Sequence, residues 1–215
     1  MARQPRAEQT RATIIEAAAD LFDRHGYEST SLSDIVAHAR VTKGALYFHF
    51  ASKEDLVHAI MDLQYRSSLR IAKEIDGQGH PSLEVLMRIT FAITRLALEE
   101  PIARAGLRLA VGRVELRHPF RHPFREWVDI AAARLLDAVK ESDVQPDVDV
   151  EVVAHSIICF FVGSRMVGRT LEPRGPQLRR IGEMWRLLVQ ALVPVPRRAH
   201  YLGLAGRLER ECGNS

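Results

Sequence analysis

Apolar residues recur every three or four positions through most of the chain, which is the spacing of one face of an α-helix. The first such segment places an apolar face between Ile14 and Phe22, and Gly26 follows where a left-handed residue can end the helix. Strict alternation of apolar and polar residues, which is typical of β-strands, is nearly absent. The pattern therefore predicts an all-α protein.

Short capped helices are predicted next, followed by one long helix. Ser31 and Asp34 have the spacing of a capping box at the start of a short second helix. Thr42 is a suitable N-cap for a third helix over "KGALYFHF", and Ser52 is a suitable N-cap for a fourth that runs to Ile75. Three short helices thus precede a long one.

Longer amphipathic segments fill the rest of the chain and are separated by breaks such as "DGQGHPS" and "EPRGP". These predicted helices cover residues 82–99, 101–112, 122–142, 148–168 and 176–192, with a weaker helix in the tail after Pro194. The predicted architecture is an N-terminal three-helix bundle over 1–53 and a larger helical domain over 54–215. Helix 52–75 connects the two.

Composition narrows the class of protein. With 215 residues, 47% of them hydrophobic, the chain can bury one sizeable core or one core and a small module. The formal net charge of +3 is compatible with a polyanionic partner but does not require one. No apolar run approaches the ~20 residues of a membrane span, so no membrane partner is expected.

Two cysteines far apart and a polar N-terminus predict a reducing, cytoplasmic location. Cys159 lies in the apolar "SIICFFVG" and is interpreted as a core residue. The chain has no nucleophile elbow, phosphate loop or zinc-protease signature, so no catalytic residue, metal or cofactor is expected.

The segment "VTKGALYFHFASKEDL", residues 41–56, combines apolar and polar side chains in a way that suits a DNA-binding helix. Two short helices joined by a tight turn form a helix-turn-helix, whose second helix lies in the DNA major groove. Ala45, Leu46 and residues 48–50 provide the apolar positions that dock this helix on the first two. The residues left for the other side are Thr42, Lys43, Gly44, Tyr47 and His49. Gly44 costs a helix about 1 kcal/mol against Ala, so it indicates close approach of another surface rather than packing. The alternative, a solvated helix in an ordinary bundle, is disfavoured.

Residues 8–56 resemble the DNA-binding domain of the TetR family of bacterial repressors. The features that carry the resemblance are Phe22, Gly26 and Tyr27, followed by "TSLSDIVAHARVTKGALYFHFASKEDL". The resemblance implies that Lys43 reaches a base edge or a phosphate, that Thr42 and Tyr47 hold phosphates, and that His49 faces the DNA backbone. Lys53 stands at a signature position and joins the predicted DNA-binding set.

Arg40 stands where the family usually has glycine. If that residue must be left-handed, the strain is about 1–2 kcal/mol, so either the turn is relaxed or Arg40 contributes a phosphate contact. Arg6 belongs to a basic N-terminal arm that is expected to touch the minor groove. The densest basic stretch, from Arg104 to Arg125, is interpreted as solvated surface rather than as a second nucleic-acid site.

The second half of the chain resembles the γ-butyrolactone autoregulator receptors of Streptomyces-type actinomycetes. The resemblance rests on "PIARAGLRLA", a Pro-rich loop and "PFREWVDIAAARLLDAV". The resemblance implies a repressor that binds a pseudo-palindromic operator in double-stranded DNA as a homodimer. It also implies that helices 148–168 and 176–192 form the dimer interface, and that a small γ-butyrolactone releases the repressor from the operator.

Trp127 stands where that branch has a tryptophan lining the hormone pocket, although a core tryptophan is the alternative. Phe161 is also expected to meet the ligand, whereas Trp185 is interpreted as a packing or interface residue. A TetR-type regulator that responds to a xenobiotic or drug is the alternative effector reading. The alternative of a different class is a helical ligand-sequestering protein or a lactone hydrolase.

Overall fold

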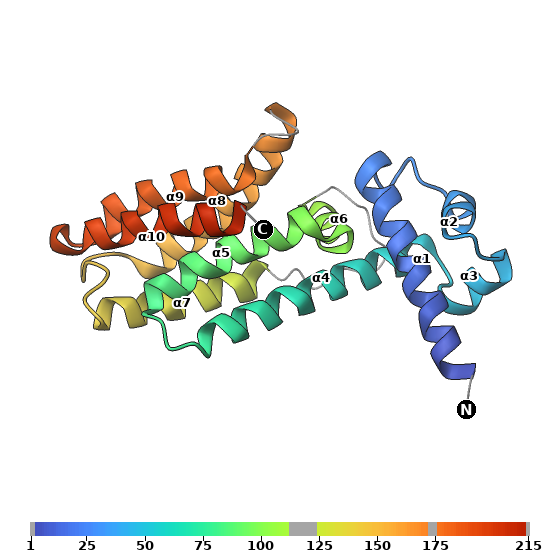
Figure 1. Cartoon of the computed structure of the whole chain (residues 1–215), viewed down its shortest axis with the longest axis horizontal. Coiled ribbons are helices and arrows are strands. Elements are labelled where there is room, and N and C mark those ends of the chain that lie inside the picture. Colours follow the sequence, from blue (N-terminus) through green and yellow to red (C-terminus); the bar gives the residue numbers. More distant parts are fainter. Residues whose placement is uncertain (1–2, 112–123, 172–175, 214–215) are drawn as a thin grey trace. The chain divides into compact units, whose positions relative to one another are not determined.

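In the computed structural model, residues 3–111, 124–171 and 176–213 are described, and they form ten helices with no strand among them (Figure 1). The predicted all-α class is confirmed. The bounds are α1 Arg3–His25, α2 Leu32–Ala39, α3 Lys43–His49, α4 Lys53–Asp76, α5 Ser82–Glu99, α6 Pro101–Val111, α7 Phe124–Lys140, α8 Val150–Leu171, α9 Gln177–Leu192 and α10 Val195–Gly213. Positions 112, 122 and 123 of the predicted helices lie outside the described residues.

The chain folds as two compact units. The first comprises residues 1–69 and 96–121, and the second comprises 70–95 and 122–215, so α4 and α5 contribute to both. The functional boundary predicted at residue 53 stays a prediction, because compactness and function are different ways of dividing a chain.

The short helices of the first unit begin at the residues that the sequence predicts. Ser31 Oγ accepts a hydrogen bond from the Asp34 amide at 3.2 Å, and the Asp34 carboxylate accepts one from the Ser31 amide at 2.8 Å, which completes the capping box. Thr42 Oγ1 accepts from the Ala45 amide at 3.1 Å. Gly26 follows α1 with a φ of 86°, in the left-handed region predicted for it.

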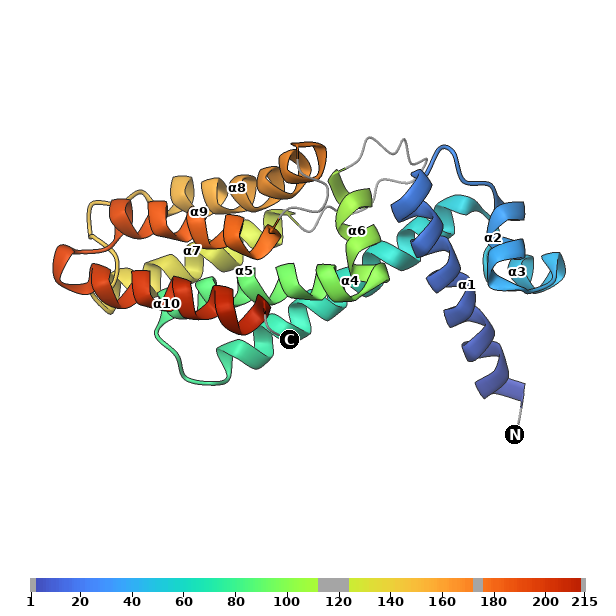
Figure 2. The same cartoon turned by 45° about the horizontal axis from the view of Figure 1, so that its top comes forward.

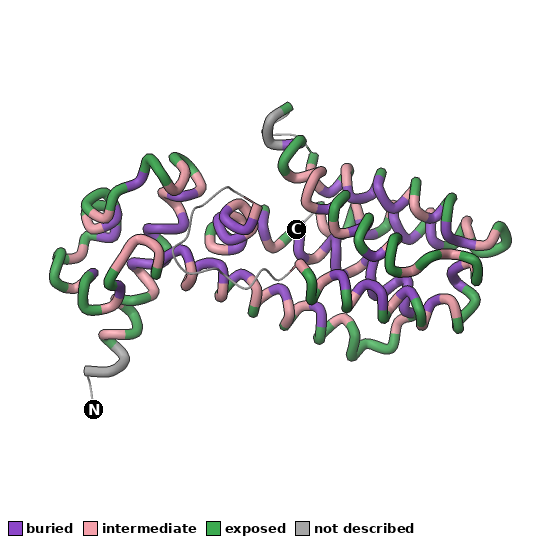
Figure 3. The backbone as a smooth tube through the Cα atoms, turned by 180° about the vertical axis from the view of Figure 1, so that it is seen from behind, coloured by how far each residue is buried: buried purple, intermediate pink, exposed green. Residues whose placement is uncertain are grey.

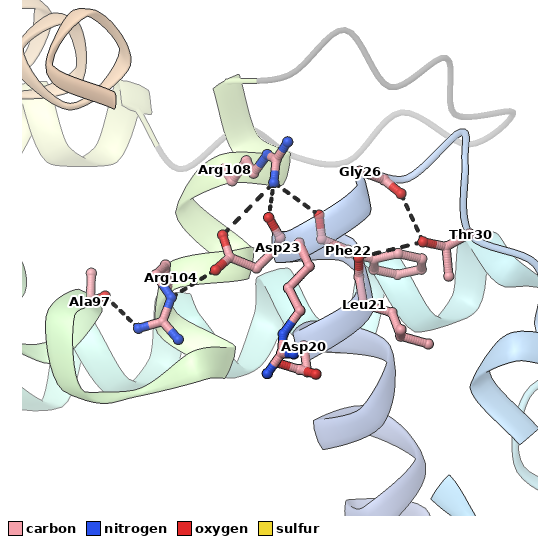
Figure 4. A network of polar contacts seen from close by, with 10 residues as sticks. Asp20, Leu21, Phe22, Asp23, Gly26, Thr30, Ala97, Arg104 and Arg108 are labelled. Carbon is pink, nitrogen blue, oxygen red and sulfur yellow. Dashed lines mark hydrogen bonds and ion pairs between the residues drawn. The ribbon is translucent and has the colours of Figure 1, made fainter. Parts of the chain in front are cut away.

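Helix α6 packs on the end of α1 within the first unit (Figure 4). Arg104 Nε donates to Asp23 Oδ2 at 2.8 Å, and Arg108 donates to the main-chain carbonyls of Phe22 and Asp23. A Cβ on Gly106 would lie 2.5 Å from the Gln64 Cβ, so glycine lets α6 come against α4 at this point.

The interpretation of the basic stretch as solvated surface was therefore wrong for Arg104 and Arg108. Both form ion pairs with Asp23 that connect α6 to α1. Arg125 is solvated as predicted, with 87% of its side chain exposed. The arginines between residues 112 and 123 lie outside the described residues.

The second unit is built around apolar faces of α5 and α9. Trp185 is fully buried, and its indole Nε1 donates to Thr90 Oγ1 at 2.7 Å, so Trp185 is a packing residue. Helix α10 lies beside α9 (Figure 1, Figure 2) and buries Tyr201, Leu204 and Leu208. The tail that gave only a weak helical pattern is thus a regular helix of 19 residues.

Helix α8 is more apolar than the sequence analysis allowed. Its stretch Val150–Gly168 is long and apolar enough to count as a candidate membrane span by length and composition alone, yet only 17% of it is buried inside the chain. The exposed apolar side chains of α8 are Val152, Phe160, Met166, Val167 and Leu171. Cys159 is exposed as well, so its interpretation as a core residue was wrong. It lies one turn after the exposed His155, on the same face of the helix.

Candidate nucleic-acid interface and effector site

The turn between α2 and α3 is tight and left-handed. Arg40 has φ 53° and ψ 40°, and its amide donates to the carbonyls of Ala37 and Val36. The Val41 amide donates to the Val36 carbonyl at 3.2 Å, which closes the helix end. The turn is therefore not relaxed, and Arg40 carries the ~1–2 kcal/mol of strain that glycine would avoid. The Arg40 side chain is exposed.

Helix α3 has one face packed on the protein and another exposed. Leu46 and Phe50 are buried against the rest of the first unit, whereas Lys43, Gly44 and Tyr47 are exposed. Figure 3 shows buried and exposed stretches of backbone alternating along the helices near the N-terminal end of the chain. The Lys43 ammonium lies 6.0 Å from the centroid of the Tyr47 ring. The structure thus places Lys43, Gly44 and Tyr47 together with the exposed Thr42 on one surface, as the sequence predicts.

Phe48 differs from the prediction, because 79% of it is exposed instead of docked on the first two helices. It lies two residues beyond the buried Leu46, and two residues of an α-helix turn through about 200°, so Phe48 must point outward. Because phenylalanine is apolar, Phe48 was predicted to dock on the first two helices, but its direction on the helix exposes it to solvent. His49 is half-buried, with its ring edge-on to Phe48 at a centroid distance of 5.0 Å.

Lys53 is occupied by contacts inside the protein. Its Nζ donates to the carbonyl oxygens of Tyr27 at 2.8 Å and Thr30 at 3.0 Å, and it lies 4.1 Å from the centroid of the Tyr27 ring. These contacts tie the start of α4 to the connection between α1 and α2. They make Lys53 a residue that positions the helix-turn-helix, while its predicted DNA contact stays a prediction.

The basic N-terminal arm is helical from Arg3. Arg6 is exposed on this helix. Arg11 lies further along the same helix, and its guanidinium carbon is 5.2 Å from the centroid of the Phe50 ring at the end of α3. The structure therefore brings Arg11 to the surroundings of α3, while the predicted DNA contact of Arg6 stays a prediction. The basic arm was the sequence signal that pointed to it.

The two predicted effector residues lie on neighbouring helices of the second unit. Trp127 is half-buried on α7, two turns before Arg134, whose guanidinium pairs with Asp76 Oδ1 at 2.9 Å. Because residues seven apart share a helix face, Trp127 lies on the side of α7 that faces the end of α4. Phe161 is buried on α8, and its carbonyl accepts from Ser164 Oγ at 2.9 Å.

A hollow of about 380 Å³ lies between α7 and α8. Its lining residues are Phe124, Arg125, Val128, His155, Ile158, Cys159 and Val162. Neither Trp127 nor Phe161 is among these lining residues, so the predicted ligand contacts of both stay predictions. Among the described residues, no cluster of three or more side chains could hold a metal ion.

Comparison with protein-family models matches both halves of the chain. Residues 14–60 match the family described as "Bacterial regulatory proteins, tetR family". Residues 80–194 match the family described as "Tetracyclin repressor-like, C-terminal domain".

Individual relatives are similar over nearly the whole chain. The A-factor receptor protein of Streptomyces griseus is 38% identical over 196 residues, which are 89% of this chain and 67% of that protein. A crystal structure of a γ-butyrolactone receptor, an ArpA-like protein, is 61% identical over 96% of this chain and 99% of its own, with a TM-score of 0.86. CprB from Streptomyces coelicolor, in complex with its biological operator sequence, is also 61% identical over the same shares, with a TM-score of 0.83.

Proposed function

Because the chain belongs to the TetR family of bacterial regulators, in the branch of the γ-butyrolactone receptors, we propose that it is a sequence-specific transcriptional repressor that a γ-butyrolactone-type signal releases from its operator. The observation that carries this proposal is the 61% identity, over 96% of the chain, to a protein whose structure includes its operator DNA. The relatives favour this reading over a drug-responsive regulator and over a lactone hydrolase. We therefore expect a regulator and not an enzyme.

The geometry of α2 and α3 supports the DNA-binding step. A tight turn joins two capped helices, and the outward face of α3 presents Lys43 and Tyr47 beside the exposed Arg40. Cationic and hydroxyl side chains of this kind hold phosphates, while a helix in the major groove reads base edges. Thr42 and Gly44 sit at the start of the same helix, where the backbone comes nearest to a docked duplex. Two copies read half-sites about one helical turn apart, or a small multiple of it.

The exposed apolar face of α8 supports a homodimer. Val152, Phe160 and Met166 are 44–60% exposed along this helix, and Leu187 is 61% exposed on α9. Contiguous exposed apolar surface marks a site of association. A second copy that packs α8 and α9 against their equivalents removes this surface from water. The apolar character of α8 then serves a dimer of a cytoplasmic protein, and not insertion into lipid.

Effector release requires a link between the effector site and α3. Trp127 and Arg134 share a face of α7, and Arg134 is paired with Asp76 near the end of α4. The other end of α4 begins four residues after α3 ends. A small amphiphile that meets Trp127 and Phe161 can therefore shift α4 and change the spacing of the two α3 helices. If 99% of the protein is in the DNA-binding conformation, the effector must bind the other conformation about 10⁴-fold more tightly to reverse that ratio fully.

The experiment that tests this function starts from a random-sequence DNA library. The full-length protein should enrich a pseudo-palindromic duplex, and binding to that duplex should weaken steeply as salt rises, because phosphate contacts release counterions. A synthetic γ-butyrolactone should then release the duplex, while a drug-like amphiphile of equal size should not. Failure to enrich any sequence contradicts the proposal. Conversion of the lactone to its hydroxy acid supports the hydrolase instead.

A further inference from the structure

Phe48 is the most exposed large apolar side chain among the residues that the structure describes, at 79%. Water contact with a whole phenyl ring is unfavourable, and burying the ring against another surface recovers that free energy. The ring is braced by His49, which meets it edge-on at 5.0 Å. A braced aromatic ring that faces solvent is therefore suited to contact something outside the chain.

The surroundings of Phe48 on α3 are small and apolar. Gly44 and Ala45 precede Phe48 by four and three residues, so they lie on the same side of the helix. A Cβ at Gly44 would meet only Thr42 Oγ1, at 4.0 Å, so the space above it is open. The outermost strip of α3 thus consists of a glycine, an alanine and a phenyl ring, without a hydrogen-bonding side chain.

Charge favours a nucleic-acid occupant for this strip. The segment Thr42–Phe50 contains Lys43 and two residues with polar rings, and it contains no acidic residue. Arg11 adds a second cation at the Phe50 end of the helix. An apolar patch framed by cations is complementary to the major groove, where bases lie between two rows of phosphates.

A phenyl ring reads only one feature of the major groove. Every base pair presents hydrogen-bonding groups there, and the apolar group is the C5-methyl of thymine. A ring that neither donates nor accepts gains contact with that methyl and gains nothing from the donors and acceptors of the other bases. Gly44 and Ala45 leave the helix free to come close enough for such a contact.

We propose that Phe48 is a specificity residue of this protein, which recognises the C5-methyl of a thymine in each operator half-site. The proposal rests on the proposed function and adds a base-reading contact to it. Lys43 and Tyr47 are exposed beside each other on the same helix, where the proposed function assigns them to polar groups of the same duplex.

The test uses the duplex that the wild-type protein enriches from a random library. One thymine per half-site is replaced at a time with uracil, which removes the methyl and leaves the pairing unchanged. At one thymine position, the wild-type protein should bind the uracil duplex about fourfold more weakly per half-site, the loss expected for one buried methyl. Fluorescence anisotropy at fixed salt measures the dissociation constants.

Three variants separate the contact from general effects. F48A should bind the thymine and uracil duplexes equally, F48L should keep part of the difference, and V195A should keep all of it, since Val195 is an exposed apolar residue of the second unit. The proposal is overturned if F48A keeps the full thymine preference, or if no thymine position matters to the wild-type protein.

A different occupant would give a different result. If F48A lowers the particle mass of the DNA-free protein in light scattering, the ring is a contact between protein copies, and the methyl-reading proposal falls. If the wild-type protein enriches no sequence at all, the proposed function itself fails. Specific binding without any methyl dependence overturns the Phe48 proposal alone.

Discussion

Arg40 occupies a left-handed position, with φ 53°, that glycine would fill without steric strain. We expect Arg40→Gly to leave the free energy of unfolding within about 1 kcal/mol of the wild type, because relief of strain offsets the greater freedom of the unfolded glycine chain. If the guanidinium holds a phosphate, operator affinity falls, and the slope of log K against log salt decreases by about 1. Anisotropy at several salt concentrations measures the slope. An unchanged slope shows that Arg40 makes no phosphate contact.

Trp127 gives a second test at the residue scale. Trp127→Ala should abolish release by the γ-butyrolactone while operator affinity changes by less than about 1 kcal/mol, because Trp127 belongs to the second unit and α3 to the first. Trp185→Ala is the matched control, since Trp185 is fully buried and bonded to Thr90. That variant should lose ~3–5 kcal/mol of folding free energy. If Trp127→Ala unfolds as readily, Trp127 is a core residue.

Single residues also show where sequence reasoning succeeds. The caps of Ser31 and Thr42 were predictable because a cap is decided by neighbours within three residues. The exposure of Phe48 and Cys159 was not predicted, because residue type favoured burial and only the direction around the helix decides it. The roles of the predicted DNA and effector residues stay predictions, since they depend on molecules that the chain binds.

At the scale of elements, the contact between α6 and α1 is stabilised by Asp23 and two arginines. Arg104→Ala should lower the melting temperature by several degrees, because it leaves the half-buried Asp23 carboxylate with weaker pairing. Arg66→Ala is the control: its pair with Asp62 is exposed, so the change should stay within about 0.5 kcal/mol. Equal melting temperatures for the two variants would contradict a structural role for the α6 contact.

Tyr201 on helix α10 makes the stability of the folded protein depend on pH. Burial of Tyr201, together with the nearby Asp143 carboxylate, raises the pKa of the Tyr201 hydroxyl above its ordinary value near 10. A raised pKa in the folded state means that the stabilisation is complete below pH 10 and is lost as the pH rises beyond it, because the unfolded tyrosine ionises first. Tyr201→Phe should therefore flatten the fall in stability above pH 10. Chemical denaturation at pH 8 and pH 11 measures it, and equal losses in both proteins would contradict the assignment.

Element positions were predictable where the apolar period was strong. The predicted segment 82–99 coincides with α5, and 176–192 differs from α9 by one residue. The predicted weakness of α10 reflects its glycines, which disfavour a helix, and its packing against α9 supplies the stability that its own sequence lacks. The packing of α6 on α1 joins residues about 80 positions apart, which periodicity does not reveal.

At the scale of the whole molecule, we expect a dimer of twice the 24.2 kDa chain at micromolar concentration. Phe160→Arg should shift the particle towards the monomer mass in light scattering, because it places a charge on the exposed apolar face of α8. Val195→Asp is the control, since Val195 is 71% exposed on α10 and outside the proposed dimer surface. A 24 kDa wild-type particle, or a Phe160→Arg protein that stays dimeric, would contradict the proposed interface.

The membership of α6 in the first unit also has a consequence for recombination between relatives. A chimaeric repressor that takes residues 1–53 from one receptor and the remainder from another separates Asp23 from the Arg104 and Arg108 with which it forms ion pairs. The transplanted residues 1–53 keep their operator preference, but they pack against an α6 from the other receptor. Exchange of DNA specificity between such proteins should therefore succeed when α6 is transferred together with residues 1–53. Substitutions at Asp23, Arg104 and Arg108 should accordingly occur together among relatives.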